Sequence, residues 1–166
     1  MHRLSSGAVS PDTSVIVDFS LTSQLRLLLD LFADRMLLSD FVEAELAPAG
    51  IKLAEVEVVK LDSDEQWDFF NDLRKAKPGL GAGELGALTV ARFRNATLLT
   101  NDKPARQRAE TVGVAYSRGI GVLEYCCEAG KLSGKGAVEL LDNMIAAGAR
   151  ISEDLVANFR RTVLNG

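Results

Sequence analysis

The chain has 166 residues, of which 47% are hydrophobic and 25% are charged, and its formal net charge is −4. These values fit one globular domain with one hydrophobic core, and they provide no overall positive field that would attract nucleic acid. No stretch approaches the ~18 uncharged apolar residues of a transmembrane helix. The residues after Met1 also lack the apolar run of a signal peptide. We therefore expect a cytoplasmic protein that does not contact a membrane.

Histidine and cysteine are scarce in this sequence. His2 is the single histidine, and the two cysteines, Cys126 and Cys127, are adjacent. This composition argues against catalytic triads and histidine-ligated zinc. Neighbouring cysteines inside an apolar helical pattern suit neither a structural disulfide nor a zinc site, so we expect both to be small core residues.

The first half of the chain alternates between short β-branched runs and helical patterns. We expect residues 1–12 to form a flexible leader and residues 13–166 to form a single domain. The run Val15–Val17 predicts a strand, because β-branched residues favour extended backbone. The expected elements are, in order, strand 15–17, helix 21–32, strand 36–38, helix 40–46 and strand 56–59.

The second half begins with a helix whose start is well defined. Ser63 and Gln66 form a capping box, and Trp67, Phe70 and Leu73 recur at the spacing of a buried helical stripe. The alternation of strands and helices predicts an α/β fold with a mainly parallel sheet covered on both faces. The further expected elements are helix 84–93, strand 96–100, helix 104–113, strand 114–116, and helices 122–129, 138–148 and from Ser152 onward.

Two of the expected strands end in a carboxylate. Asp18 follows the strand at 15–17, and Asp102 follows the strand at 96–100. Ligands of open α/β sheets bind outside the carboxyl ends of the strands, so these two acids are expected to lie side by side. Such oxygen ligands suit Mg²⁺ or Mn²⁺.

Two other motifs are weaker. Residues 81–86 match the dinucleotide-binding pattern GxGxxG, but no strand precedes them directly, so no nucleotide cofactor is expected. Asp18 also begins a segment that resembles the nucleophile loop of haloacid-dehalogenase phosphatases. That family needs a second aspartate where this chain has Ser20, which makes a phosphatase a weaker alternative.

Four acidic segments occur in an order that resembles the PIN-domain family, and most closely its stand-alone prokaryotic VapC-like nucleases and toxins. The resemblance covers residues 14–164, and residues 140–152 are similar to the C-terminal extension of one subgroup. The segments are Asp18 in Val-Ile-Val-Asp-Phe-Ser, Glu45 in Val-Glu-Ala-Glu-Leu, Glu84 in Gly-Ala-Gly-Glu-Leu-Gly, and Asp102 in Thr-Asn-Asp-Lys-Pro-Ala-Arg.

The resemblance implies a three-layer α/β/α PIN-like fold with a short, mainly parallel sheet and extra C-terminal helices. It further implies a metal-dependent endoribonuclease in which Asp18, Glu84 and Asp102 hold Mg²⁺ or Mn²⁺. Glu45 would complete the catalytic acidic cluster, and Ser20 or Thr100 would orient a ligand or water. The implied partners are an RNA substrate, an antitoxin protein if the chain is a toxin, and a second copy in a homodimer.

Several alternatives stay open at this point. Glu43 lies close enough to Glu45 to be the second acid instead, and Asp18 or Asp102 could simply cap the helix that follows. Many PIN-domain relatives carry aspartate where this chain has Asn101, which lowers the negative charge of the site. A catalytically weak PIN-like module that binds RNA or protein is therefore the alternative function.

Basic residues near the acidic segments are candidates for RNA phosphate contacts. They could equally be ordinary solvated surface residues. The candidates are Arg92, Lys103 and Arg106.

Overall fold

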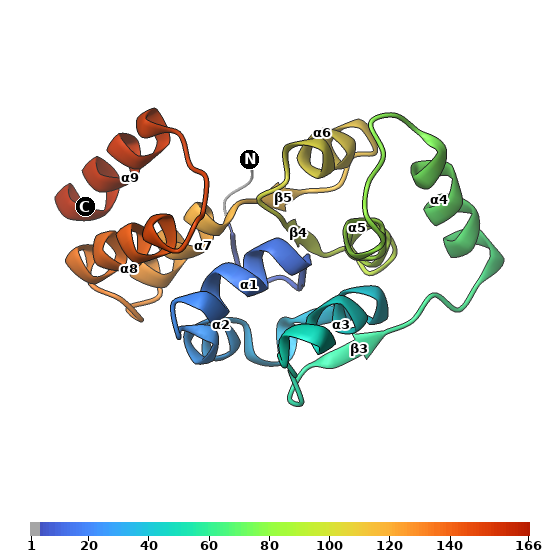
Figure 1. The fold of residues 1–166 in the computed structure, drawn as a ribbon, viewed down its shortest axis with the longest axis horizontal. Coiled ribbons are helices and arrows are strands. Elements are labelled where there is room, and N and C mark those ends of the chain that lie inside the picture. The colour runs from blue at the N-terminus through green and yellow to red at the C-terminus, as the bar shows by residue number, and fades with distance from the viewer. Residues whose placement is uncertain (1–3) are drawn as a thin grey trace.

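The computed structural model describes residues 4–166 and shows a short central sheet surrounded by helices (Figure 1). Strands β1, β4 and β5 form a parallel sheet in the order β1-β4-β5, and β2 pairs in parallel with β3. An isolated parallel bridge between Val9 and Met36 joins the two sheets. The strands are β1 (Val9–Pro11), β2 (Leu37–Ser39), β3 (Glu57–Val59), β4 (Thr97–Leu99) and β5 (Tyr116–Ser117).

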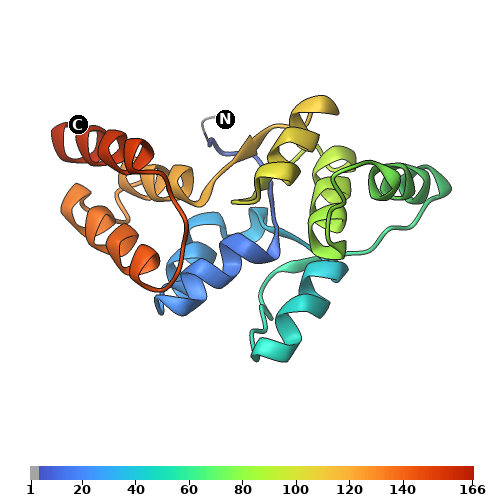
Figure 2. The ribbon, with the colours of Figure 1, turned by 45° about the horizontal axis from the view of Figure 1, so that its top comes forward.

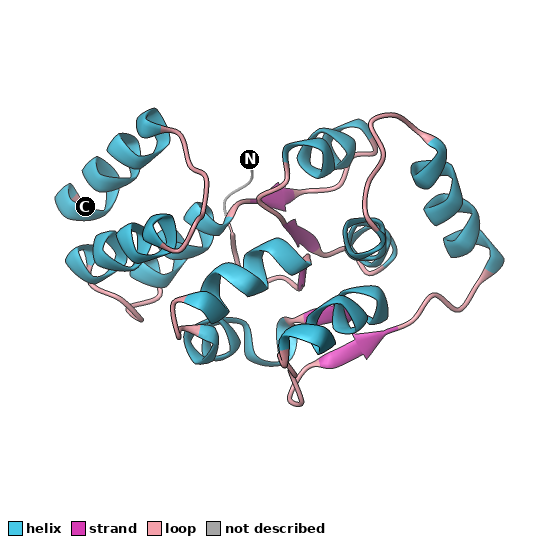
Figure 3. Ribbon diagram, in the orientation of Figure 1, coloured by secondary structure: helices cyan, strands magenta, loops and turns pink. Residues whose placement is uncertain are grey.

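Helices make up most of the chain (Figure 3). They are α1 (Thr13–Leu21), α2 (Leu25–Phe32), α3 (Asp40–Leu46), α4 (Asp64–Lys75), α5 (Ala82–Phe93), α6 (Lys103–Thr111), α7 (Gly119–Glu128), α8 (Gly134–Ala146) and α9 (Glu153–Asn165), with 3-10 turns η1 (Ala33–Arg35) and η2 (Ala47–Ala49). The expected three-layer α/β/α fold with a short parallel sheet and additional C-terminal helices is confirmed.

The helices differ in how deeply they are buried. Helix α5 packs against β1, β2, β4 and α3, and eight of its twelve residues are buried. The C-terminal helices α7, α8 and α9 gather at one end of the molecule, and α4 lies at the opposite end (Figures 1 and 2). In residues 4–166 no helix has the length and apolar character required to cross a bilayer.

The N-terminal region differs from the sequence-based expectation. The segment Val15–Val17 is part of helix α1 and not a strand, and the first strand is Val9–Pro11, inside the stretch expected to be a flexible leader. Asp12 caps α1 by accepting a hydrogen bond from the backbone N–H of Val15 at 3.3 Å. The β-branched side chains at 15 and 16 are fully buried, so packing outweighs their preference for extended backbone.

Other differences are smaller. The single helix expected over 21–32 is two helices, because the chain turns at residues 22–24 and Ser23 adopts a positive φ of 58°. Trp67 was expected in the core but is 42% exposed, and it packs edge-on against Phe41 and Phe70. Cys126 is buried and Cys127 half-buried, and both are free thiols. The remaining expected elements agree with the structure to within a few residues.

Candidate active site

Adjacent parallel strands bring two carboxylates to one edge of the sheet. Strand β1 ends at Pro11, which is in register with Leu99 at the end of β4. Asp12 therefore follows one strand, and Asp102 follows the other after a two-residue link. This is the edge where open α/β sheets bind their ligands. Two acids therefore follow neighbouring strands, but the first of them is Asp12, whereas the sequence-based expectation named Asp18.

Asp12 is almost completely enclosed, with 1% of its surface exposed. Its Oδ1 accepts hydrogen bonds from Ser14 Oγ at 2.6 Å and from the backbone N–H of Val15, and its Oδ2 accepts one from Thr100 Oγ1. Burial raises the pKa of Asp12, the three hydrogen bonds oppose that rise, and the nearby charge of Asp102 adds to it. A buried carboxylate beside another is stabilised by a bound cation.

Thr100 links the two acids. Its hydroxyl donates to Asp12 and accepts from the backbone N–H of Asp102 at 3.1 Å. Asp102 also caps α6, because its Oδ2 accepts from the backbone N–H of Ala105 at 2.9 Å. Its Oδ1 has no hydrogen-bond partner among residues 4–166, so capping leaves one oxygen free for a ligand.

Helices α3 and α5 add two glutamates to this edge. Glu45 Oε2 accepts from Thr13 Oγ1 at 2.5 Å, and its Oε1 accepts from the backbone N–H of Gly83 at 2.8 Å. Glu84 Oε2 accepts from the backbone N–H of Gly81 at 3.0 Å, which caps the start of α5. The contacts of Glu45 therefore tie α3 to the residues that follow β1 and to the first turn of α5.

The charges of these acids act on one another. The pKa of Glu84 is raised, first by burial and then by the charges of Asp102, Asp12 and Glu45. Four carboxylates from four separate segments thus share one electrostatic environment. Like charges held close together favour protonation, and a bound cation would favour the ionised carboxylates.

The choice between Glu43 and Glu45 is a matter of helix face. Glu45 contacts Gly83 and Thr13 as described, whereas Glu43 lines a separate surface hollow with Asp40 and Lys52. The structure therefore brings Glu45 to the cluster.

Asp18 lies within helix α1 and does not itself follow a strand. Its Oδ2 accepts from Asn101 Nδ2 at 2.8 Å, and burial raises its pKa with no contribution from another carboxylate. Asn101 Oδ1 in turn accepts from the backbone N–H of Gly119 at 2.9 Å. The pair connects α1 to the start of α7. Ser20 is on the same helix, two residues beyond Asp18.

The three basic candidates do not share one location. Arg106 Nη1 donates to the backbone oxygen of Asn101 at 2.6 Å, next to the acidic cluster. Lys103 is exposed at the first position of α6. Arg92 lies in the last turn of α5, eight residues after Glu84, or ~12 Å along the helix axis.

Sequence reasoning missed Asp12, although a sign of its role was present. An Asp directly before a Thr-Ser pair and an apolar run is a typical helix start. The preceding Pro11 argues against a strand directly before that helix, because proline is rare inside sheets. It is tolerated here as the last residue of β1.

The donor set fits a hard divalent cation, since Asp12, Glu45, Glu84 and Asp102 offer only oxygen ligands. Within the described residues, however, no three acidic, histidine or cysteine side chains are arranged around a common point as metal ligands. Glu45, Glu84 and Asp102 are each turned toward a backbone N–H group of a helix start. The chemistry of the site therefore fits Mg²⁺ or Mn²⁺, and binding requires some of these side chains to rotate.

Comparison with known proteins gives one match. A family model described as a PIN domain matches residues 8–164, and this range includes β1 and all four carboxylates of the cluster. No curated protein and no solved structure matches the sequence.

Proposed function

Because the chain belongs to the PIN-domain family, whose members are generally nucleases, we propose that it is a metal-dependent endoribonuclease that hydrolyses RNA phosphodiester bonds. The observation that carries this proposal is that four carboxylates meet at one edge of the sheet: Thr100 links Asp12 to Asp102, and the start of α5 holds both Glu45 and Glu84. Carboxylates held close together repel one another, and a bound cation would relieve that repulsion.

The proposed ligands of Mg²⁺ or Mn²⁺ are Asp12 and Asp102, with Glu84 and Glu45 completing the site. A bound divalent ion supplies an activated water and neutralises charge on the phosphate. Thr100 fixes the orientation of Asp12 through its hydroxyl. Glu45 is exposed and Glu84 is half-buried, so both can turn from their backbone partners toward a cation.

The direct test compares matched carboxylate variants. Purified protein should cut a fluorescently labelled RNA with Mn²⁺ or Mg²⁺ and stop when EDTA is added. D12N and D102N should each lose at least ~100-fold in rate, above the range typical of groups that only support a metal ligand. The control is D18N, which changes an aspartate outside the cluster and should retain most of the activity.

Other outcomes separate the alternatives. Undiminished cleavage by D12N would refute the proposed site. A total loss of cleavage in D18N would show that Asp18 belongs to the catalytic site. RNA binding without any cleavage would favour a PIN-like binding module. Hydrolysis of a generic aryl phosphate in place of RNA would favour a phosphatase.

We also propose that the chain is the toxin of a toxin–antitoxin pair, blocked by a small antitoxin protein at the acidic edge and able to form a homodimer. The four carboxylates offer a positively charged antitoxin segment a complementary surface. Expression in a bacterial host should arrest growth, and D12N should not. Normal growth on expression of active nuclease would contradict the toxin role, and sedimentation would test the dimer.

A further inference from the structure

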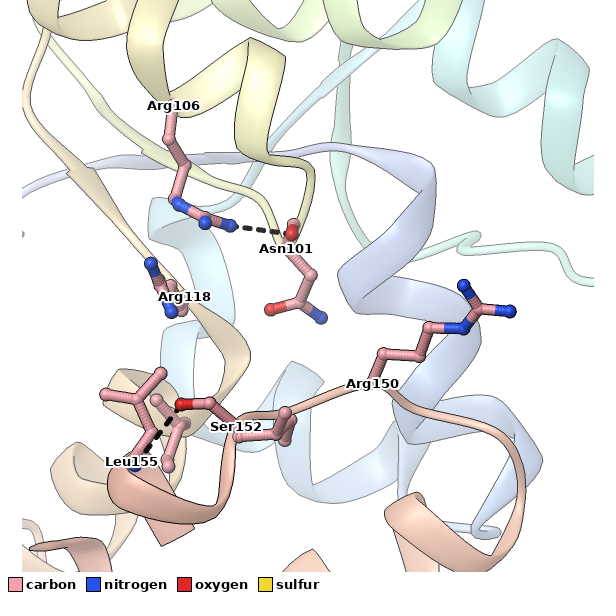
Figure 4. Close-up of a pocket in the computed structure, with 8 residues that line it drawn as sticks. Asn101, Arg106, Arg118, Arg150, Ser152 and Leu155 are labelled. Atoms are coloured by element: carbon pink, nitrogen blue, oxygen red, sulfur yellow. Dashed lines mark hydrogen bonds between the residues drawn. The ribbon is translucent and has the colours of Figure 1, made fainter.

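A small pocket beside the acidic cluster is lined by three arginines. It has a volume of about 100 Å³, and Asn101 and Ser152 also line it (Figure 4). Arg106 comes from α6, Arg118 from the link between β5 and α7, and Arg150 from the link between α8 and α9. No acidic residue is among those that line the pocket.

The guanidinium groups in this pocket lack acidic partners. Arg106 donates one hydrogen bond, to the backbone oxygen of Asn101, and no ion pair involves Arg106, Arg118 or Arg150 in the part of the chain that the structure describes. Figure 4 shows Arg106 and Arg118 near one another, whereas the guanidinium of Arg150 extends away from them.

The two neighbouring guanidiniums repel each other. The pKa of Arg106 is lowered, first by burial and then by the charge of Arg118, while the charges of Tyr116 and Asp102 oppose this. Two half-buried cations without an anion between them are unfavourable, and a bound anion would relieve that cost. Guanidinium groups match phosphate oxygens in geometry and bind them bidentately.

The pocket adjoins the acidic edge through consecutive residues. Asn101 lines the pocket, and Asp102 belongs to the carboxylate cluster. Ser152 caps α9, so the N-terminus of that helix adds a favourable dipole on the pocket's other side. The pocket therefore lies next to the carboxylates, and the charge of Asp102 acts on Arg106.

We propose that Arg106, Arg118 and the α9 N-terminus at Ser152 form a phosphate-binding subsite that holds a backbone phosphate of the RNA close to the bond that is cut. This inference rests on the proposed nuclease function for the identity of the substrate. It gives the C-terminal helices a role in substrate binding, since Arg118 and Ser152 begin α7 and α9.

The test measures RNA binding in EDTA, where no cleavage occurs, by fluorescence anisotropy of a short labelled single strand. R118Q should weaken binding by about 10-fold, the loss of one charged contact, and should lower the salt dependence by about one phosphate contact. R118K keeps the positive charge but loses the bidentate geometry of the guanidinium group, so its RNA affinity should lie between those of the wild type and R118Q. The matched control is R74Q, which removes an exposed arginine in the last turn of α4, far from the pocket, and should change binding by less than about twofold.

Competition with inorganic phosphate tests whether the pocket binds a phosphate of the RNA backbone or a free phosphate ion. At constant ionic strength, phosphate should compete with RNA for the wild type and compete less for R118Q. Phosphate binding that depends on Arg118, together with RNA binding that does not, would overturn the proposal in favour of a free-anion site. Equal RNA affinities of R118Q and wild type would overturn it as well.

The subsite and the nuclease function can fail separately. RNA binding that depends on Arg118 without any Mn²⁺-dependent cleavage supports the subsite and contradicts the nuclease. Cleavage by R118Q with unchanged KM and kcat supports the nuclease and contradicts the subsite. The Tm of R118Q should be at least as high as that of the wild type, because this side chain forms no hydrogen bond or ion pair in the described structure and its charge repels Arg106.

Discussion

Gly83→Ala should separate the position of Glu45 from the stability of the fold. A Cβ atom at position 83 would lie 2.7 Å from Glu45 Cδ and 2.8 Å from Glu45 Oε1, too close for either to stay in place. The obstacle is the end of an exposed, flexible side chain, so the carboxylate can swing into solvent. The substitution should therefore move the Glu45 carboxylate out of the cluster and leave the backbone of α5 unchanged.

The expected loss of stability is small. Alanine is favoured over glycine in a helix by about 1 kcal/mol, whereas the lost hydrogen bond from Gly83 N–H to the charged Glu45 carboxylate is worth about 1.5–3 kcal/mol before solvation of the exposed carboxylate is counted. A net loss of about 1 kcal/mol would lower the Tm by roughly 2–4 °C in a domain of this size. RNA cleavage and Mn²⁺ affinity should fall by about 10- to 100-fold, as when a group that supports a metal ligand is removed.

Thermal unfolding, Mn²⁺ titration and RNA cleavage measured on one preparation provide the assay. Gly81→Ala is the matched control, because its Cβ would lie 3.9 Å from Glu84 Oε2, an ordinary contact. It should keep both activity and metal affinity. Full activity of G83A would refute a functional position for Glu45, and a Tm drop beyond about 10 °C would show that the added methyl group meets more than a flexible side chain.

Three further predictions concern charge and packing. Burial raises the pKa of Asp12, so the protonated carboxyl stabilises the fold and this stabilisation is lost as the pH rises through the raised pKa. In EDTA at pH 7, D12N should therefore unfold at a higher urea concentration than the wild type. At acidic pH, where Asp12 is protonated, the two proteins should unfold at the same urea concentration. N101D replaces the amide donor to Asp18 with a second carboxylate and should lower the Tm, whereas N101D with D18N restores a donor–acceptor pair and should recover much of it. Phe159 is fully buried, so F159A should cost about 3–5 kcal/mol in urea unfolding.

Local patterns in the sequence were enough to predict most of the elements. The capping box at Ser63, the proline at position 104 and the apolar spacing of residues 122–129 each depend on neighbours within one or two helical turns. Such interactions are encoded in short segments, and the three helices form as predicted. At the first of them Ser63 caps α4, whereas the Gln66 side chain accepts from the backbone N–H of Asp62 and not of Ser63. Glu45, Glu84 and Asp102 were likewise identified as candidates from the order of their segments.

The N-terminal acid could not be chosen in this way. Val15 and Ile16 favour a strand by local preference, yet their burial in the core and the cap at Asp12 make the segment a helix. Because the first strand is Val9–Pro11 and not Val15–Val17, the acid that follows it is Asp12 and not Asp18.

The sequence by itself determined the fold class, the family and the types of residue available for metal and phosphate chemistry. Only the tertiary structure decided which acid stands at the end of β1, which glutamate of α3 faces α5, and that Arg106 and Arg118 share one pocket. The physical reason is that helix and strand periodicity acts over a few residues, whereas these juxtapositions depend on strand pairing and core packing between segments up to about 90 residues apart.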